Sequence, residues 1–155
     1  LISKRMNEMT SFQREKCKRV ISKLMNNPLA EIFREPVTDD LEGYNIIVKR
    51  KMCLSDVFNN LEMQKIKTME DFKEDTLLIF RNCVDYWKRD PRGGIYVSTA
   101  QVVREIFEKE FERIAVSPEN EWILKIQRTA RKLEEARNMF AEELISRLDE
   151  AKIKV

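Results

Sequence analysis

Apolar residues recur at helical spacing in the first part of the chain, and this spacing is then lost. Between about residues 10 and 26 they follow the i, i+3, i+4 pattern of an amphipathic helix. They are Phe12, Cys17, Val20, Ile21, Leu24 and Met25. Pro28 is expected to end this helix, because the residue before a proline is pushed away from helical geometry. The helical period is absent from about residue 28 to residue 53, where we predict a long loop.

Three later stretches regain the helical period. Ser55 is the expected N-cap of a short second helix, and Thr68 is the expected N-cap of a longer third helix. Residues 90–94 form a loop, after which Ser98 or Thr99 is expected to start a fourth helix. The core-facing positions predicted in these helices are Val57, Phe58, Leu61, Phe72, Thr76, Ile79, Phe80, Cys83, Tyr86, Trp87, Ala100, Val103, Phe107, Phe111 and Ile114. The pattern predicts an all-α fold, a four-helix bundle with a long loop between its first and second helices.

A further helix is predicted at the C-terminal end. Ser117 and Pro118 form a helix start, in which an N-cap is followed by proline at the first helical position, and the helix can run to about Glu150. Its apolar residues form a stripe that resembles heptads and is interrupted by Arg137. They are Trp122, Ile126, Ala130, Leu133, Phe140, Leu144 and Leu148. Two interpretations stay open: the first half packs on the bundle, or the stripe docks on a protein partner, as in a coiled coil.

The composition fits one helical domain with one appended element. Of the 155 residues, 43% are hydrophobic and 36% are charged, and the three glycines and four prolines are too few for many tight β-turns. The net charge of +2 does not by itself predict a nucleic-acid partner. No apolar run reaches the ~20 residues that span a bilayer, so no membrane association is expected. Because the chain begins at Leu1 rather than Met, we expect a fragment of a longer protein.

The sequence offers few groups for catalysis. It contains no histidine, which excludes histidine-based triads and imidazole metal ligands. Cys17, Cys53 and Cys83 are odd in number and widely spaced, which is typical of free thiols in a reducing compartment. Among them we expect Cys83 to be the most buried and Cys53 the most reactive. The acidic residues within 39–42 have no accompanying nucleophile or base, so we predict no enzyme activity, no cofactor and no metal site.

Two groups of residues carry a resemblance to a known family. The first group is Phe33-Arg34-Glu35-Pro36-Val37, then Tyr44, then Lys51-Met52-Cys53-Leu54. The second group is Asp71-Phe72, then Asp75, then Asn82-Cys83-Val84-Asp85-Tyr86-Trp87. In this order and at this spacing they resemble a bromodomain, the four-helix acetyl-lysine reader of chromatin proteins.

The resemblance implies a fold, a pocket and a function. The fold is a left-handed four-helix bundle of bromodomain type over residues 10–116, followed by the additional helix within residues 117–155. The pocket would lie at one end of the bundle, between the long loop and the loop after the third helix. The residues implied for the acetyl-lysine pocket are Phe33, Pro36, Val37, Tyr44, Asn82, Cys83, Tyr86, Trp87 and Tyr96. The implied protein is nuclear and chromatin-associated, and its partner is an acetylated histone or another acylated peptide.

Trp87 departs from the family pattern, which has at this position an asparagine that donates a hydrogen bond to the acetyl carbonyl. An indole offers one donor and no acceptor, and its ring brings about 150–250 Å² of surface. The ring can therefore fill the pocket or frame it. We predict an atypical reader with altered, weak or lost acetyl-lysine binding. The alternative is an interaction scaffold without a lysine pocket, which uses the bundle surface or the long C-terminal helix.

Overall fold

The computed structural model describes residues 8–38 and 40–153. Asp39, one of the acidic residues of the predicted loop, lies outside the described residues. The chain divides into two compact units, one ending at Ile114 and one beginning at Ala115, and each is described by itself. Every regular element within the described residues is a helix, which confirms the predicted all-α class.

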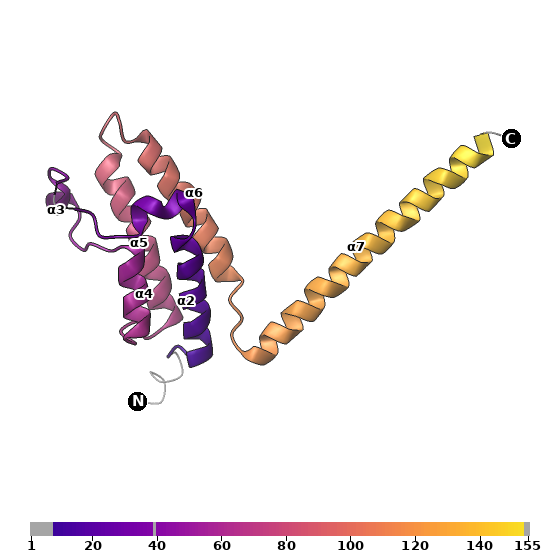
Figure 1. The fold of residues 1–155 in the computed structure, drawn as a ribbon, viewed down its shortest axis with the longest axis horizontal. Helices are drawn as coiled ribbons and strands as arrows, with labels where there is room; N and C mark the ends of the chain where they lie inside the picture. Colours follow the sequence, from indigo (N-terminus) through magenta and orange to yellow (C-terminus); the bar gives the residue numbers. More distant parts are fainter. Residues whose placement is uncertain (1–7, 39, 154–155) are drawn as a thin grey trace. The chain divides into compact units, whose positions relative to one another are not determined.

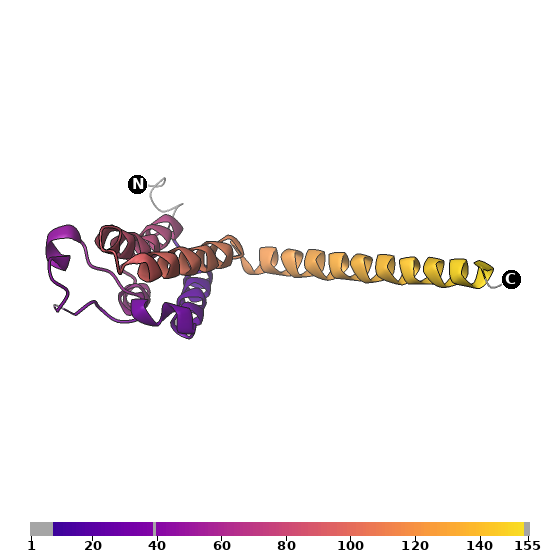
Figure 2. The same ribbon diagram turned by 90° about the horizontal axis from the view of Figure 1, so that it is seen from above.

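Four long helices make up the first unit. They are α2 (Ser11–Met25), α4 (Leu54–Glu62), α5 (Met69–Trp87) and α6 (Gly94–Glu112). Two short elements, η1 (Pro28–Phe33) and α3 (Tyr44–Ile47), lie in the connection between α2 and α4. Helix α2 packs on α4 and α6, and α5 packs on both of these helices. In both views α3 lies outside the four long helices (Figures 1 and 2). The predicted four-helix bundle with a long first connection is confirmed.

The core of the bundle is built around α5. Phe72 packs edge-on against Phe107 of α6 with ring centroids 5.7 Å apart, and Phe80 packs edge-on against Phe33 at 5.3 Å. The buried Thr76 hydroxyl donates to the Phe72 carbonyl at 2.8 Å, so its burial leaves no unpaired hydroxyl. A fully buried large apolar side chain contributes about 1.5–3 kcal/mol. The predicted core positions that are buried are Cys17, Val20, Ile21, Leu24, Val57, Leu61, Phe72, Thr76, Ile79, Phe80, Ala100, Val103 and Phe107.

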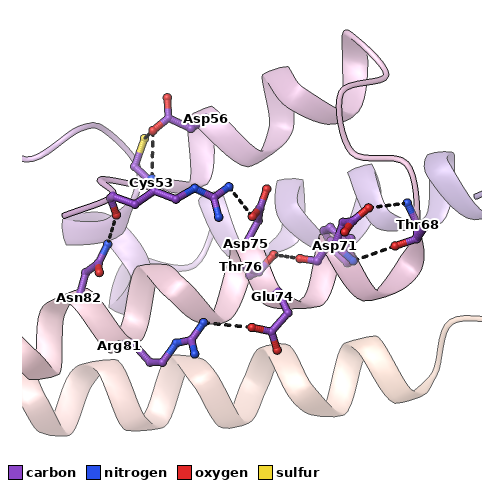
Figure 3. Close-up of polar contacts among 11 residues, drawn as sticks. Cys53, Asp56, Thr68, Asp71, Glu74, Asp75, Thr76, Arg81 and Asn82 are labelled. Carbon is purple, nitrogen blue, oxygen red and sulfur yellow. Dashed lines mark hydrogen bonds and ion pairs between the residues drawn. The ribbon is translucent and has the colours of Figure 1, made fainter. Parts of the chain in front are cut away.

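The starts of α4 and α5 are fixed by capping boxes. Thr68 caps α5 as predicted: its hydroxyl accepts from the Asp71 amide at 3.0 Å, and Asp71 accepts from the Thr68 amide at 3.1 Å (Figure 3). The prediction of Ser55 as the cap of α4 is wrong, because α4 begins at Leu54 and its N-cap is Cys53. The reason is that Asp56 reaches back and accepts from the Cys53 amide at 3.1 Å.

Helix α6 starts earlier than the sequence pattern predicted. It begins at Gly94 rather than near Ser98 or Thr99. The two hydroxyls do not cap the helix but donate to carbonyls one turn earlier inside it, Ser98 to Gly94 at 2.9 Å and Thr99 to Ile95 at 2.8 Å. This back-bonding is the usual alternative to capping for serine and threonine.

The second unit is dominated by one helix, α7 (Pro118–Ile153), which has 36 residues. Its start is as predicted: the Ser117 hydroxyl accepts from the Asn120 amide at 3.1 Å, and Pro118 is the first helical residue. The helix continues beyond the predicted end near Glu150. None of its described residues is buried, and most of its large apolar side chains are exposed. No helix in the described part of the chain has the length and apolarity needed to cross a membrane.

Gly93 is expected to be required by the packing at the C-terminal end of α5. A Cβ atom built on it would lie 2.2 Å from the Trp87 carbonyl oxygen, a clash with backbone rather than with a movable side chain. Gly93→Ala should therefore lower the free energy of unfolding by about 1–3 kcal/mol, as overpacked sites do. The measurement is urea unfolding followed by circular dichroism and tryptophan fluorescence.

Gly94→Ala is the matched control, because nothing lies within 4 Å of a Cβ at Gly94. This substitution should leave stability unchanged or raise it by up to about 1 kcal/mol, since alanine favours helices more than glycine does. Equal stabilities for the two variants would contradict the proposed close approach.

Candidate functional site

A cavity of about 410 Å³ lies at one end of the bundle. Its walls come from η1, the segment that follows η1, the start of α3, the residues before α4, the second half of α5 and the start of α6. The lining residues are Glu31, Ile32, Phe33, Glu35, Pro36, Val37, Thr38, Leu41, Tyr44, Met52, Cys53, Ile79, Cys83, Trp87 and Tyr96. The lining is mainly apolar, which is the usual character of a ligand pocket.

The indole of Trp87 frames this cavity. The ring is half-buried and stacks on Tyr96 of α6, with centroids 4.2 Å apart and planes 13° from parallel. Tyr86 meets the same indole edge-on at 5.0 Å. The close approach of Gly93 to the Trp87 carbonyl brings the start of α6 back towards the end of α5. The indole is therefore held by aromatic contacts to neighbours on both helices, while the cavity beside it remains.

Tyr44 is another aromatic residue of the cavity that carries a polar group. It is buried, and its ring packs edge-on against Tyr86 at 5.2 Å. Burial raises the pKa of its hydroxyl above the ordinary value, so the hydroxyl keeps its proton and can donate. No hydrogen bond joins this hydroxyl to another described residue. Tyr44 therefore brings a hydrogen-bond donor to the cavity that the described residues leave unused.

Asn82 and Tyr86 hold the long connection against α5 and are not among the lining residues. The Asn82 amide donates to the Arg50 carbonyl at 2.8 Å, and the Tyr86 hydroxyl donates to the Glu42 carbonyl at 2.9 Å. The Arg50 side chain in turn pairs with Asp75 of α5 at 2.6 Å (Figure 3). These contacts fix the connection at two points on either side of α3, and the connection then serves as one wall of the cavity.

Two of the three cysteines line the cavity. Cys53 is 2% exposed, whereas Cys83 is half-buried and its thiol donates to the Tyr96 carbonyl at 3.6 Å. The expectation that Cys83 is the most buried cysteine is wrong, because Cys17 and Cys53 are both more buried. Burial raises the pKa of Cys83 to about 11 and that of Cys17 to about 12, and it also raises the pKa of Cys53.

The structure brings together most, but not all, of the residues suggested by the sequence. Those that line the cavity are Phe33, Pro36, Val37, Tyr44, Cys83, Trp87 and Tyr96. Four further apolar lining residues, Ile32, Leu41, Met52 and Ile79, were not among the residues suggested for the pocket. Met52 belongs to the first group of residues that carry the family resemblance. Ile79 belongs to the apolar stripe of the third helix and was assigned to the core. For Leu41 the sequence offers only one weak indication, namely that it is a single apolar residue within an acidic loop.

Glutamates provide the charge in the wall of the cavity. Among the described residues, the charged ones in its lining are Glu31 and Glu35. Of the basic residues near the rim, Arg50 is paired with Asp75, and the Lys51 ammonium lies over the Tyr44 ring at 5.9 Å. Within the described residues no group of three or more acidic, cysteine or histidine side chains could hold a metal ion.

Comparison with known proteins identifies the class of protein. The family model for the bromodomain matches residues 17–98, a range that includes every lining residue of the cavity. The chain belongs to the bromodomain family, the class of helical modules that reads acetylated lysine in chromatin-associated proteins.

Several curated proteins are similar to this chain. Bromodomain-containing factor 1 of Saccharomyces cerevisiae is 30% identical over 116 residues, which cover 70% of this chain and 16% of that protein. The E3 ubiquitin-protein ligase TRIM33 of Xenopus laevis is 35% identical over 83 residues, 52% of this chain and 8% of that protein. Histone acetyltransferase GCN5 of Yarrowia lipolytica is 38% identical over 68 residues, 43% of this chain and 15% of that protein. The match thus spans between 8% and 16% of the length of these relatives.

Cys83, and not Cys53 as the sequence suggested, should be the first thiol to react in the native protein, because it is the least buried of the three and lines the cavity. A pKa of about 11 instead of 9.0 leaves about a hundredth of the usual thiolate at pH 8. Alkylation by iodoacetamide should therefore be slow at pH 8 and rise about tenfold per pH unit up to pH 10. Peptide mass spectrometry gives the order of labelling, with the urea-unfolded chain as control. Faster labelling of Cys53 would contradict this order.

Proposed function

We propose that the cavity beside Trp87 binds the acylated side chain of lysine in a histone or another basic peptide, and that the protein acts in the nucleus. The observation that carries the proposal is the stack of Trp87 on Tyr96, which puts the indole in the wall and leaves about 410 Å³ beside it. A ligand does not have to expel the ring. The energetic objection to binding, namely the loss of the indole's own burial, therefore does not arise.

The lining suits an acylated lysine better than a free one. Acylation removes the charge of the ammonium group, and an uncharged, mainly apolar chain can enter an apolar cavity without a large desolvation cost. The acyl carbonyl still needs a donor, because an unpaired buried carbonyl costs about 1–3 kcal/mol. The candidates are the hydroxyls of Tyr44 and Tyr96 and the indole N–H of Trp87, none of which bonds another described residue.

The rim supports a lysine-rich peptide as the source of that side chain. Glu31 and Glu35 provide negative charge at the cavity, and Arg50 is neutralised by Asp75. Opposite charge steers a basic tail towards the site and disfavours acidic competitors. Among similar proteins, one is named a histone acetyltransferase and another the SWR1 complex bromodomain subunit bdf1, from Schizosaccharomyces pombe. These names support histone tails and a nuclear location as the first choice.

Trp87→Asn should strengthen binding of acetyl-lysine. Asparagine restores the short donor that the family has at this position, and one further hydrogen bond to the carbonyl is worth about 1 kcal/mol, or about fivefold in Kd. The probe is a lysine-rich peptide with one Nε-acetyl-lysine, measured by calorimetry against the full chain and its variant. The same peptide without the acetyl group is the control.

The same measurement separates the reader from the scaffold alternative. A reader should bind the acetylated peptide in the unaltered chain and bind it more tightly in the variant. A protein with no lysine pocket should bind neither the acetylated nor the unacetylated peptide, whether residue 87 is tryptophan or asparagine. Trp87→Phe is a useful second variant, because it retains a ring to stack on Tyr96 but lacks the indole N–H donor.

Tyr44→Phe should weaken binding of the acetylated peptide by about fivefold, because it removes one hydrogen-bond donor worth about 1 kcal/mol. The ring contact with Tyr86 stays, so stability should change little. Unfolding of the variant is measured beside its affinity. Unchanged affinity would exclude the Tyr44 hydroxyl as a donor to the ligand.

A further inference from the structure

Helix α7 exposes an apolar stripe along its whole length. Counted in heptads, its a positions are Ile123, Ala130, Arg137, Leu144 and Ala151, and its d positions are Ile126, Leu133, Phe140 and Arg147. All of these side chains are exposed in α7. A stripe that repeats every 3.5 residues over four heptads is typical of a coiled coil. A helix with this stripe gains stability only when another surface covers the stripe.

We propose that the stripe is covered by α7 of a second copy of this chain, in antiparallel orientation. Charge decides against the parallel orientation. In a parallel pair equivalent core positions face each other, so Arg137 would face Arg137 and Arg147 would face Arg147 inside the seam. In an antiparallel pair an a position faces a d position, and neither arginine meets its own copy.

One antiparallel register fits the size and charge of the side chains. It places Ile126 opposite Leu144 of the second copy and the small Ala130 opposite the large Phe140. Arg137 then faces Leu133, and because an a position borders the e position of the facing helix, its guanidinium lies beside Glu134 of the second copy. Because the two helices are related by symmetry, this ion pair forms twice in the dimer.

The same register gives Arg147 a partner as well. As a d position it borders the g position of the facing helix, which here is Trp122, and a guanidinium over an indole is favourable. A shift by one heptad in either direction would instead place Arg137 beside the uncharged Gln127 or Ala141. In the single helix Arg137 pairs with its own Glu134 at 3.6 Å, so both groups already lie on the side of the helix where the proposed ion pair forms.

The oligomeric state of the full chain is the first test. Sedimentation equilibrium over a range of concentrations should show a dimer. Phe140→Asp should make the chain monomeric, because it places a carboxylate in the seam. Met139→Asp is the matched control: Met139 is exposed to a similar degree, 70% against 62% for Phe140, but lies outside the seam. A monomer at all concentrations, or equal effects of the two variants, would overturn the proposal.

A mixing experiment tests the register. Glu134→Lys alone places an ammonium group beside Arg137 of the second copy, and Arg137→Glu alone places two carboxylates together. Because two attractive pairs become repulsive, each variant should dimerise about tenfold more weakly. An equimolar mixture of the two should recover dimers, because both facing pairs then attract. Mixing leaves the pairs within each helix unaltered, so recovery reports only on contacts between helices. If the mixture does not recover dimers, this register is excluded.

Cross-linking tests the orientation. The full chain with Ile126→Cys and a differently tagged full chain with Leu144→Cys should form a mixed disulfide on oxidation, and neither should cross-link to itself. Equivalent 126 positions in the antiparallel pair are about 27 Å apart, from 18 residues at 1.5 Å each, far beyond the reach of a disulfide. The unaltered chain controls for its native cysteines. Self-cross-linking of both chains would show a parallel pair instead.

Discussion

The stack of Trp87 on Tyr96 is the contact on which the candidate site depends. It joins the last residue of α5 to the first turn of α6 across a short connection, and the connection is short enough only because Gly93 approaches the Trp87 carbonyl without a side chain. If the indole lost this neighbour, its large apolar surface would be better buried in the adjacent cavity. We therefore expect the close approach at Gly93 to help hold the indole in the wall of the cavity.

Helix α5 has three faces: one packs in the core, one lines the cavity and one holds the long connection. Phe72, Thr76 and Phe80 form the core face, while Ile79, Cys83 and Trp87, spaced at i, i+4 and i+8, form the cavity face. The third face carries Asp75, Asn82 and Tyr86, which bind Arg50 and Glu42 of the long connection. The side chains that hold the wall are therefore direct neighbours of those that line the cavity, and one rigid helix positions both sets.

The sequence predicted the helices and the core well, because both follow from the 3.6-residue period. It failed at the starts of α4 and α6, where Ser55, Ser98 and Thr99 each had two possible hydrogen-bond partners and only the folded backbone selects one. The residues of the pocket came from resemblance, which orders positions along the chain but gives no direction to a side chain. This is why Asn82 and Tyr86 were grouped with the lining, while Ile79, which is buried in the core as predicted and also lines the cavity, was not. The orientation of Trp87 depends on Tyr96 and Gly93 together, which no local pattern encodes.

The proposed pairing of α7 would place two pockets in one assembly. In the antiparallel register residue 118 of one copy faces residue 152 of the other, so the two helix starts lie about 51 Å apart, from 34 residues at 1.5 Å each. Each start is joined in sequence to its own bundle through residues 115–117. Two pockets carried on one rod gain avidity only for a ligand whose acylated lysines can reach both at once. A ligand with two acylated lysines that reach both pockets would therefore bind the proposed dimer more tightly than a ligand with one.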